Sequence, residues 1–145
     1  MRNDLIVSKS ILINANLDKV WDVLTNPERI KEYLYGTETV TTWEPGKEII
    51  FRGNYNGHEY QDHGTILEII KNKKLSYSYW SGFSGLEDKP ENYSIVTYEL
   101  KEITDNQTEF TWTQKGYSTQ ENYKHSLDGM DDLLITIKEI TERNS

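Results

Sequence analysis

The stretch of sequence that decides the fold reads TQENYKHSLDGMDDLLITIKEITER, over residues 119–143. A rotation of about 100° per residue places its apolar side chains on one side and acidic ones opposite, which is the pattern of an amphipathic helix. Ser118 and Glu121 have the spacing of a capping box, which predicts where the helix begins. The apolar side consists of Tyr123, Leu127, Met130, Leu133, Leu134, Ile137 and Ile140.

The two halves of this apolar side differ in bulk. Its C-terminal half carries large aliphatic side chains, whereas Ser126 and Gly129 make the N-terminal half thin. Because small side chains leave space, we expect the helix to lie across a curved sheet and to roof a hollow beneath its thin half.

Composition and charge narrow the class of protein. The chain has 145 residues, enough for one domain spanning residues 1–145, and 12% of them are aromatic, including ten Tyr and four Trp. Aromatic-rich strands suit the wall of a pocket. The net charge of −8 argues against nucleic acid or an anionic membrane as partner. Without cysteine, a signal peptide or a membrane-spanning apolar run, a cytoplasmic protein is expected.

The remaining elements are predicted from periodicity and turn residues. A strand is expected at residues 5–14, followed by short helices at 17–25, capped by Asn16, and from Pro27 up to Gly36. Alternating patterns predict six further strands, at residues 37–43, 48–55, 58–70, 75–80, 93–103 and 108–116. Asn56-Gly57 is a strong hairpin signal. The sequence therefore predicts an α+β fold in which a curved antiparallel sheet of about seven strands is wrapped around a long C-terminal helix.

One face of the predicted sheet supplies candidate ligand-binding residues. Strand alternation puts three aromatic-rich sets on the same face, beneath the thin half of the helix. The expected lining consists of Tyr77, Tyr79, Val96, Tyr98, Leu100, Phe110, Trp112 and Gln114 from strands, with Tyr123, Leu127 and Met130 from the helix. The alternative, that these side chains meet and fill the space, stays open. The inward parity of the strand at 58–70 is also open, since a bulge there would switch it.

Catalytic and metal chemistry finds little support in the sequence. His58 and His63 differ by an odd number, so on one strand they point to opposite faces, which opposes a shared metal site. His125 lies on the acidic side of the terminal helix, which is read as a solvated face or as a docking surface for a basic partner. We predict no catalytic residue, no metal and no cofactor.

Several motifs, in their order along the chain, carry a family resemblance. They are Val20-Trp21 followed by Thr25-Asn26-Pro27-Glu28, then Trp43-Glu44-Pro45-Gly46, and then Gly64 with Tyr77, Tyr79 and Trp80. This arrangement resembles the START-like helix-grip superfamily (SRPBCC, birch-pollen-allergen-like fold). Its most similar branch is the one named for activators of the ATPase of heat shock protein ninety.

The resemblance implies a hydrophobic cavity between the sheet and the long helix, and it leaves three functions open. The first is a protein that binds a small hydrophobic or aromatic molecule. The second is a co-chaperone-like protein that binds a heat-shock chaperone and stimulates its ATPase. The third is a cyclase or hydrolase acting on an aromatic or polyketide-like substrate. Its candidate polar groups are Tyr77, Tyr79, Tyr98, Gln114 and Glu68. A monomer and a homodimer are both compatible with the sequence.

Overall fold

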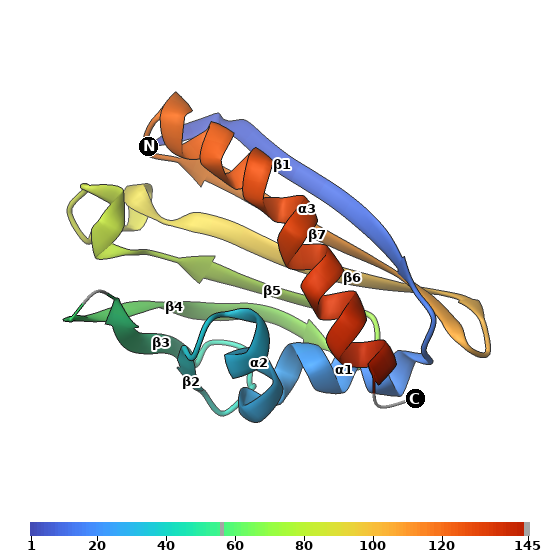
Figure 1. The fold of residues 1–145 in the computed structure, drawn as a ribbon. Helices are drawn as coiled ribbons and strands as arrows, with labels where there is room; N and C mark the ends of the chain where they lie inside the picture. Colours follow the sequence, from blue (N-terminus) through green and yellow to red (C-terminus); the bar gives the residue numbers. More distant parts are fainter. Residues whose placement is uncertain (56, 144–145) are drawn as a thin grey trace.

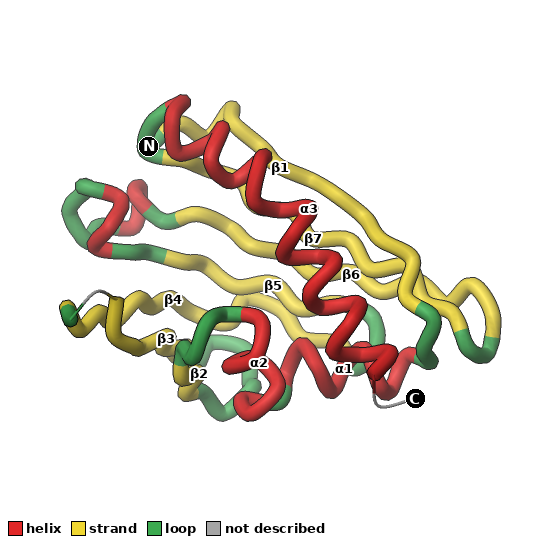
Figure 2. The backbone as a smooth tube through the Cα atoms, viewed as in Figure 1, coloured by secondary structure: helices red, strands yellow, loops and turns green. Residues whose placement is uncertain are grey.

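A computed structural model describes residues 1–55 and 57–143 (Figures 1 and 2). The chain begins with β1 (Arg2–Ile13), α1 (Leu17–Thr25) and α2 (Pro27–Tyr33). Six strands follow, and the long helix α3 (Gln120–Arg143) ends the described part. The strands are β2 (Glu38–Val40), β3 (Glu48–Tyr55), β4 (His58–Ile70), β5 (Lys74–Tyr79), β6 (Ser94–Thr104) and β7 (Gln107–Tyr117), with the short 3-10 helices η1 (Gly82–Ser84) and η2 (Pro90–Asn92) between β5 and β6.

All seven strands join one antiparallel sheet. Its spatial order is β1-β7-β6-β5-β4-β3-β2, so the first strand pairs with the last. The register places Val7 beside Gln114 and Tyr98 beside Trp112. These pairings confirm the predicted α+β helix-grip fold. No helix in the described ranges is long and apolar enough to cross a membrane.

Helix α3 crosses one face of the sheet diagonally, from the N-terminal end of β1 toward α1 (Figure 1). Its buried side is Met130, Leu134, Ile137, Ile140 and Thr141. Two lysines fasten it to β1: Lys9 Nζ donates to the Leu127 carbonyl at 3.0 Å, and Lys138 Nζ donates to the Leu12 carbonyl at 2.9 Å. The expected capping box is displaced by one residue, because Thr119 Oγ1, rather than Ser118, accepts from the Asn122 backbone N–H.

The two short helices begin as their sequences indicate. Asn16 accepts a hydrogen bond from the Lys19 backbone N–H, and Asn26 accepts one from Glu28. Pro27 occupies the first turn of α2, where its missing N–H costs nothing. Both helices lie at the end of the sheet where α3 finishes, beside the β2 and β3 edge (Figure 1).

The second strand is shorter than predicted. Residues 37–43 were expected to be extended, but β2 covers only Glu38–Val40. Pairing with β3 ends at Val40, and Trp43 has a left-handed φ of 59°, which is incompatible with an extended strand up to that residue. In the expected Asn56-Gly57 hairpin, Asn56 lies outside the described residues; Tyr55 pairs with His58, and Gly57 has a φ of 82°.

A β-bulge in β4 changes which alternate residues of the strand face the core. The pairing of β4 with β5 shifts between Ile66 and Glu68. Ile66 is fully buried, whereas the next residue, Leu67, is 48% exposed, and after the bulge Ile69 packs against the core. Both parities are therefore present, one on each side of the bulge. Asp62, four residues before Ile66, consequently faces inward.

Two glycines give a matched test of this packing. A Cβ on Gly64 would lie 1.6 Å from the Ser78 carbonyl oxygen, whereas one on Gly129 in α3 meets nothing within 4 Å. We expect Gly64→Ala to lower the free energy of unfolding by about 3 kcal/mol or more. Gly129→Ala should raise it by roughly 0.5–1 kcal/mol, because alanine has the higher helix propensity. Urea unfolding of both variants measures the difference; equal effects would contradict the close approach of β4 and β5.

Candidate ligand-binding cavity

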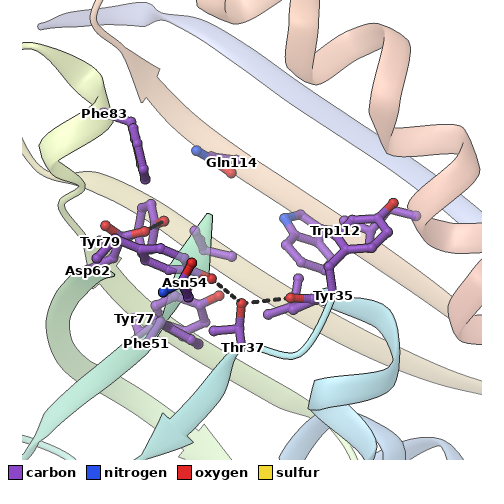
Figure 3. A pocket seen from close by; sticks show the side chains of 14 residues that line it. Tyr35, Thr37, Phe51, Asn54, Asp62, Tyr77, Tyr79, Phe83, Trp112 and Gln114 are labelled. Atoms are coloured by element: carbon purple, nitrogen blue, oxygen red, sulfur yellow. Dashed lines mark hydrogen bonds between the residues drawn. The ribbon is translucent and has the colours of Figure 1, made fainter. Parts of the chain in front are cut away.

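A cavity of about 660 Å³ opens between the sheet, α3 and the chain segment after α2 (Figure 3). Strands β3 to β7 supply its floor, and Leu133 is the residue of α3 that contacts it. The lining residues are Leu34, Tyr35, Thr37, Phe51, Asn54, Tyr60, Asp62, Tyr77, Tyr79, Phe83, Val96, Trp112, Gln114 and Leu133.

Aromatic residues make up half of the lining, seven of the fourteen residues. The Phe51 ring lies 5.6 Å from the Tyr77 ring and 5.8 Å from the Tyr79 ring, centroid to centroid. Tyr77 and Tyr79 are two residues apart on β5, so both point to the same face of the sheet. Phe51 points to that face from β3. Tilted and edge-on contacts of this kind stabilise the rings against each other without closing the space in front of them.

A buried carboxylate lies in this wall. Asp62 is 5% exposed, and its Oδ2 accepts a hydrogen bond of 2.5 Å from the Tyr79 hydroxyl. Burial raises the pKa of Asp62, while hydrogen bonds from the side chains of Tyr79 and Ser81 act in the opposite direction and lower it. The group is an acceptor held in a fixed orientation at one side of the cavity.

Two pairs of hydroxyls are hydrogen-bonded in the wall or directly behind it. The hydroxyls of Tyr77 and Tyr98 share a hydrogen bond of 2.8 Å, and those of Thr37 and Tyr60 share one of 2.5 Å. Burial is the main cause that raises the pKa of both Tyr77 and Tyr98 above the ordinary value, so both remain neutral hydroxyls. The cavity is thus an apolar surface with a few oriented polar atoms.

Two exposed aromatic residues border the mouth of the cavity. Tyr35 is 90% exposed and has a left-handed φ of 52°, which a side chain other than glycine seldom adopts. Phe83, in η1, is 63% exposed and stands 5.8 Å from the Tyr60 ring. The Ser81 hydroxyl accepts from the Phe83 backbone N–H and so fixes the start of η1. Apolar rings left in water beside an apolar cavity are typical of a ligand entrance.

Some of the residues predicted to line the cavity are found in its wall, and the others lie in the core. It brings Tyr77, Tyr79, Val96, Trp112 and Gln114 to the lining. Tyr98 lies behind Tyr77 and borders a much smaller void, whereas Leu100, Phe110 and Met130 are buried in the core, and Tyr123 and Leu127 are half-buried and pack against that core.

The reason is that large side chains fill the space beneath the thin half of α3. The Tyr117 ring packs 5.5 Å from that of Tyr123, and its hydroxyl shares a hydrogen bond of 2.7 Å with Ser126. Tyr98 packs against Trp112 at 4.6 Å. The hollow therefore lies farther toward β3 and β4 than the bulk of the helix side chains indicated.

Nine lining residues lie outside the predicted set, and Thr37, Phe51, Tyr60 and Asp62 are among them. A signal existed, since counting outward from the Asn56-Gly57 turn pairs Phe51 with Asp62. The pairing was not used, because the sequence left undecided which residues of the strand at 58–70 face inward.

His63, whose side chain is hydrogen-bonded, lies on the face of the sheet opposite the cavity. His63 follows Asp62 on β4 and therefore points away from the cavity. Its Nε2 shares a hydrogen bond of 2.7 Å with Asp88 and lies 3.2 Å from the Tyr93 hydroxyl. Among the described residues no group of three or more His, Cys, Asp or Glu side chains is placed to hold a metal ion.

The fold and the cavity define a helix-grip protein, in which a curved sheet and a C-terminal helix enclose an internal space. Within that class, the chain belongs to the family described as activator of Hsp90 ATPase homolog 1-like protein, whose sequence pattern matches residues 14–142. The family predicted from the motifs is thereby confirmed. No curated protein matches the chain in sequence.

Solved structures of similar proteins share the fold. A protein of Cytophaga hutchinsonii, solved in solution, is 38% identical, covers 99% of this chain and 98% of its own, and has a TM-score of 0.83. A crystal structure from Mesorhizobium loti is 21% identical over 97% of this chain and 98% of that one, with a TM-score of 0.77. The Aha1 dimer of Colwellia psychrerythraea is 17% identical over 94% and 96%, with a TM-score of 0.72.

The raised pKa of Asp62 predicts a pH dependence of stability. Because the folded state holds this proton more tightly than the unfolded state does, stability falls as pH rises from the ordinary value of 3.8 through the folded pKa. Asp62→Asn removes that loss. The variant's free energy of unfolding, relative to the unsubstituted protein, should therefore increase from below pH 3.8 to neutral pH.

The control for this measurement is Asp4→Asn. The hydrogen bond from exposed Arg2 lowers the pKa of Asp4, so removing this carboxylate should give a trend of opposite sign. Denaturant unfolding across this pH range gives both trends. A flat difference for Asp62→Asn would show that burial does not disfavour its charged form.

Proposed function

We propose that this protein binds a small, uncharged, apolar or aromatic molecule in the cavity between the sheet, α3 and the segment after α2. The observation that carries the proposal is the hollow itself, which stands between aromatic walls where a closed core would have been packed solid. Its volume of about 660 Å³ falls in the range of cavities that hold small ligands.

The charge of the cavity supports a neutral ligand. Asp62 places a carboxylate in the wall, and the whole chain carries a net charge of −8. An anionic ligand would meet unfavourable electrostatic interactions in a site of low dielectric. A neutral molecule gains instead from removing aromatic surface from water.

The arrangement of polar groups favours binding over turnover. Tyr77, Tyr79 and Thr37 donate or accept within fixed pairs, and His63 faces the opposite side of the sheet. A general base must reach the proton that it abstracts. The groups of the cavity that the structure describes hold and orient a molecule, and this is the role that we assign to them.

A pair of tryptophan substitutions on α3 tests the proposal. Leu133 contacts the cavity, whereas Ile135, two residues farther along, is 46% exposed and does not line it. The probe is N-phenyl-1-naphthylamine, a neutral aromatic molecule whose fluorescence rises in apolar surroundings. We expect the unsubstituted protein to bind it, and Leu133→Trp to weaken binding by about tenfold, a loss of roughly 1.4 kcal/mol.

Ile135→Trp is the matched control, because it adds the same ring to the same helix outside the cavity. Its affinity for the probe should stay that of the unsubstituted protein. Cooperative urea unfolding of both variants confirms that each is folded. Equal weakening by the two substitutions, or no binding to the unsubstituted protein, would rule out the cavity as the binding site.

A further inference from the structure

The indole nitrogen of Trp112 is a hydrogen-bond donor without a partner. Trp112 is 6% exposed, and its Nε1 is buried with no acceptor among the described residues. Most buried polar atoms in proteins are paired, and a buried N–H that has lost its water without gaining a partner costs free energy. Trp112 lines the cavity, and Figure 3 shows its nitrogen on the edge of the ring nearer Gln114; almost none of that atom's surface is reached by water, so a ligand atom meets it when a neighbouring side chain moves aside.

A second polar group stands next to it on the same strand. Gln114 lies two residues along β7, so both side chains project from the same face of the sheet (Figure 3). Gln114 is half-buried, lines the cavity, and its amide makes no hydrogen bond within the described part of the chain. Val96 lies beside it on β6 and supplies an apolar surface. Trp112 and Gln114 together form a polar strip on an otherwise apolar wall.

This strip differs from the paired polar groups of the cavity wall. The hydroxyls of Thr37, Tyr60 and Tyr77 and the carboxylate of Asp62 all have protein partners. The indole N–H, in contrast, has no protein partner, and it can only donate. The complementary ligand atom is therefore an acceptor.

We propose that the molecule bound in this cavity is a neutral aromatic compound with a carbonyl oxygen, and that this oxygen accepts a hydrogen bond from Trp112 Nε1, with the Gln114 amide beside it. The proposal rests on the proposed binding function and names the chemical class of the ligand. The carbonyl is preferred to a carboxylate because Asp62, in the same cavity, disfavours a second negative charge. The aromatic body of the ligand then lies against Phe51, Tyr77 and Val96.

Two planar probes of nearly equal shape test the proposal. Fluorene is a hydrocarbon, and fluorenone differs from it by one carbonyl group. Their affinities are measured by displacement of N-phenyl-1-naphthylamine from the unsubstituted protein, Trp112→Phe and Trp80→Phe. Trp112→Phe keeps an aromatic ring and removes the donor. Trp80 is the control, because its Nε1 already donates to the Leu86 carbonyl at 3.2 Å and it does not line the cavity.

The readout is the ratio of the fluorene to the fluorenone dissociation constant, in which the different solubilities of the probes cancel between variants. We expect Trp112→Phe to lower this ratio by about fivefold, as the loss of one neutral hydrogen bond predicts. Trp80→Phe should leave it unchanged. An unchanged ratio in Trp112→Phe, with both probes still binding, overturns the carbonyl proposal and leaves the binding function intact. Binding of neither probe to the unsubstituted protein overturns both.

A measurement on the unsubstituted protein covers the case in which Trp112→Phe does not fold. The indole ¹H–¹⁵N resonance of Trp112 reports hydrogen bonding at that nitrogen. Fluorenone should move this proton downfield, and fluorene should not. The same displacement with both probes would mean that the ring senses the ligand without donating to it, which contradicts the proposal.

Discussion

The structure depends on the docking of one helix across a sheet that is wider than the helix can cover. A helix with its side chains is about 10 Å across, whereas seven strands about 4.8 Å apart span roughly 29 Å. Lys9 on β1 donates to a backbone carbonyl of α3, and Lys138 on α3 donates to a backbone carbonyl of β1. The helix is therefore fixed toward the β1 side, and the inner face near β3 and β4 is left to the chain around α2. A cavity forms where that cover is incomplete.

Paired hydroxyls explain how a wall of tyrosines can be buried. A tyrosine ring is apolar, but its hydroxyl needs a partner when water is removed. Tyr77 finds one in Tyr98, Tyr79 in Asp62, and Tyr60 in Thr37. Each pair also fixes the direction of a ring, so the rings stand as a wall. Phenylalanine or leucine at the same positions would lack this restraint and would be freer to collapse into the hollow.

The sequence predicted the elements better than the location of the cavity. Helix caps and strand alternation are local signals, and they predicted α1, α2, α3 and the succession of strands along the chain. The bulge after Ile66 depends on pairing with β5, and the left-handed Trp43 depends on the turn beside it, so neither has a local signature. The position of the hollow depends on which long side chains reach beneath α3. Tyr117 fills the place that Ser126 was expected to leave empty.

An open apolar hollow is unfavourable in the unliganded protein and becomes the source of affinity when a ligand enters. Water that enters at the mouth formed by Tyr35 and Phe83 meets a lining that is mostly apolar. Displacing that water contributes roughly 25 cal/mol for each Å² of apolar surface that the ligand covers. This gain does not depend on the orientation of the ligand. Direction must come from fixed polar atoms, and these stand apart on two strands: the acceptor Asp62 on β4 and the donor Trp112 on β7. A ligand hydrogen-bonded to either of them can lie in the cavity in only a few ways. In the complex that we propose, the aromatic walls would therefore supply most of the affinity and the two polar atoms the selectivity.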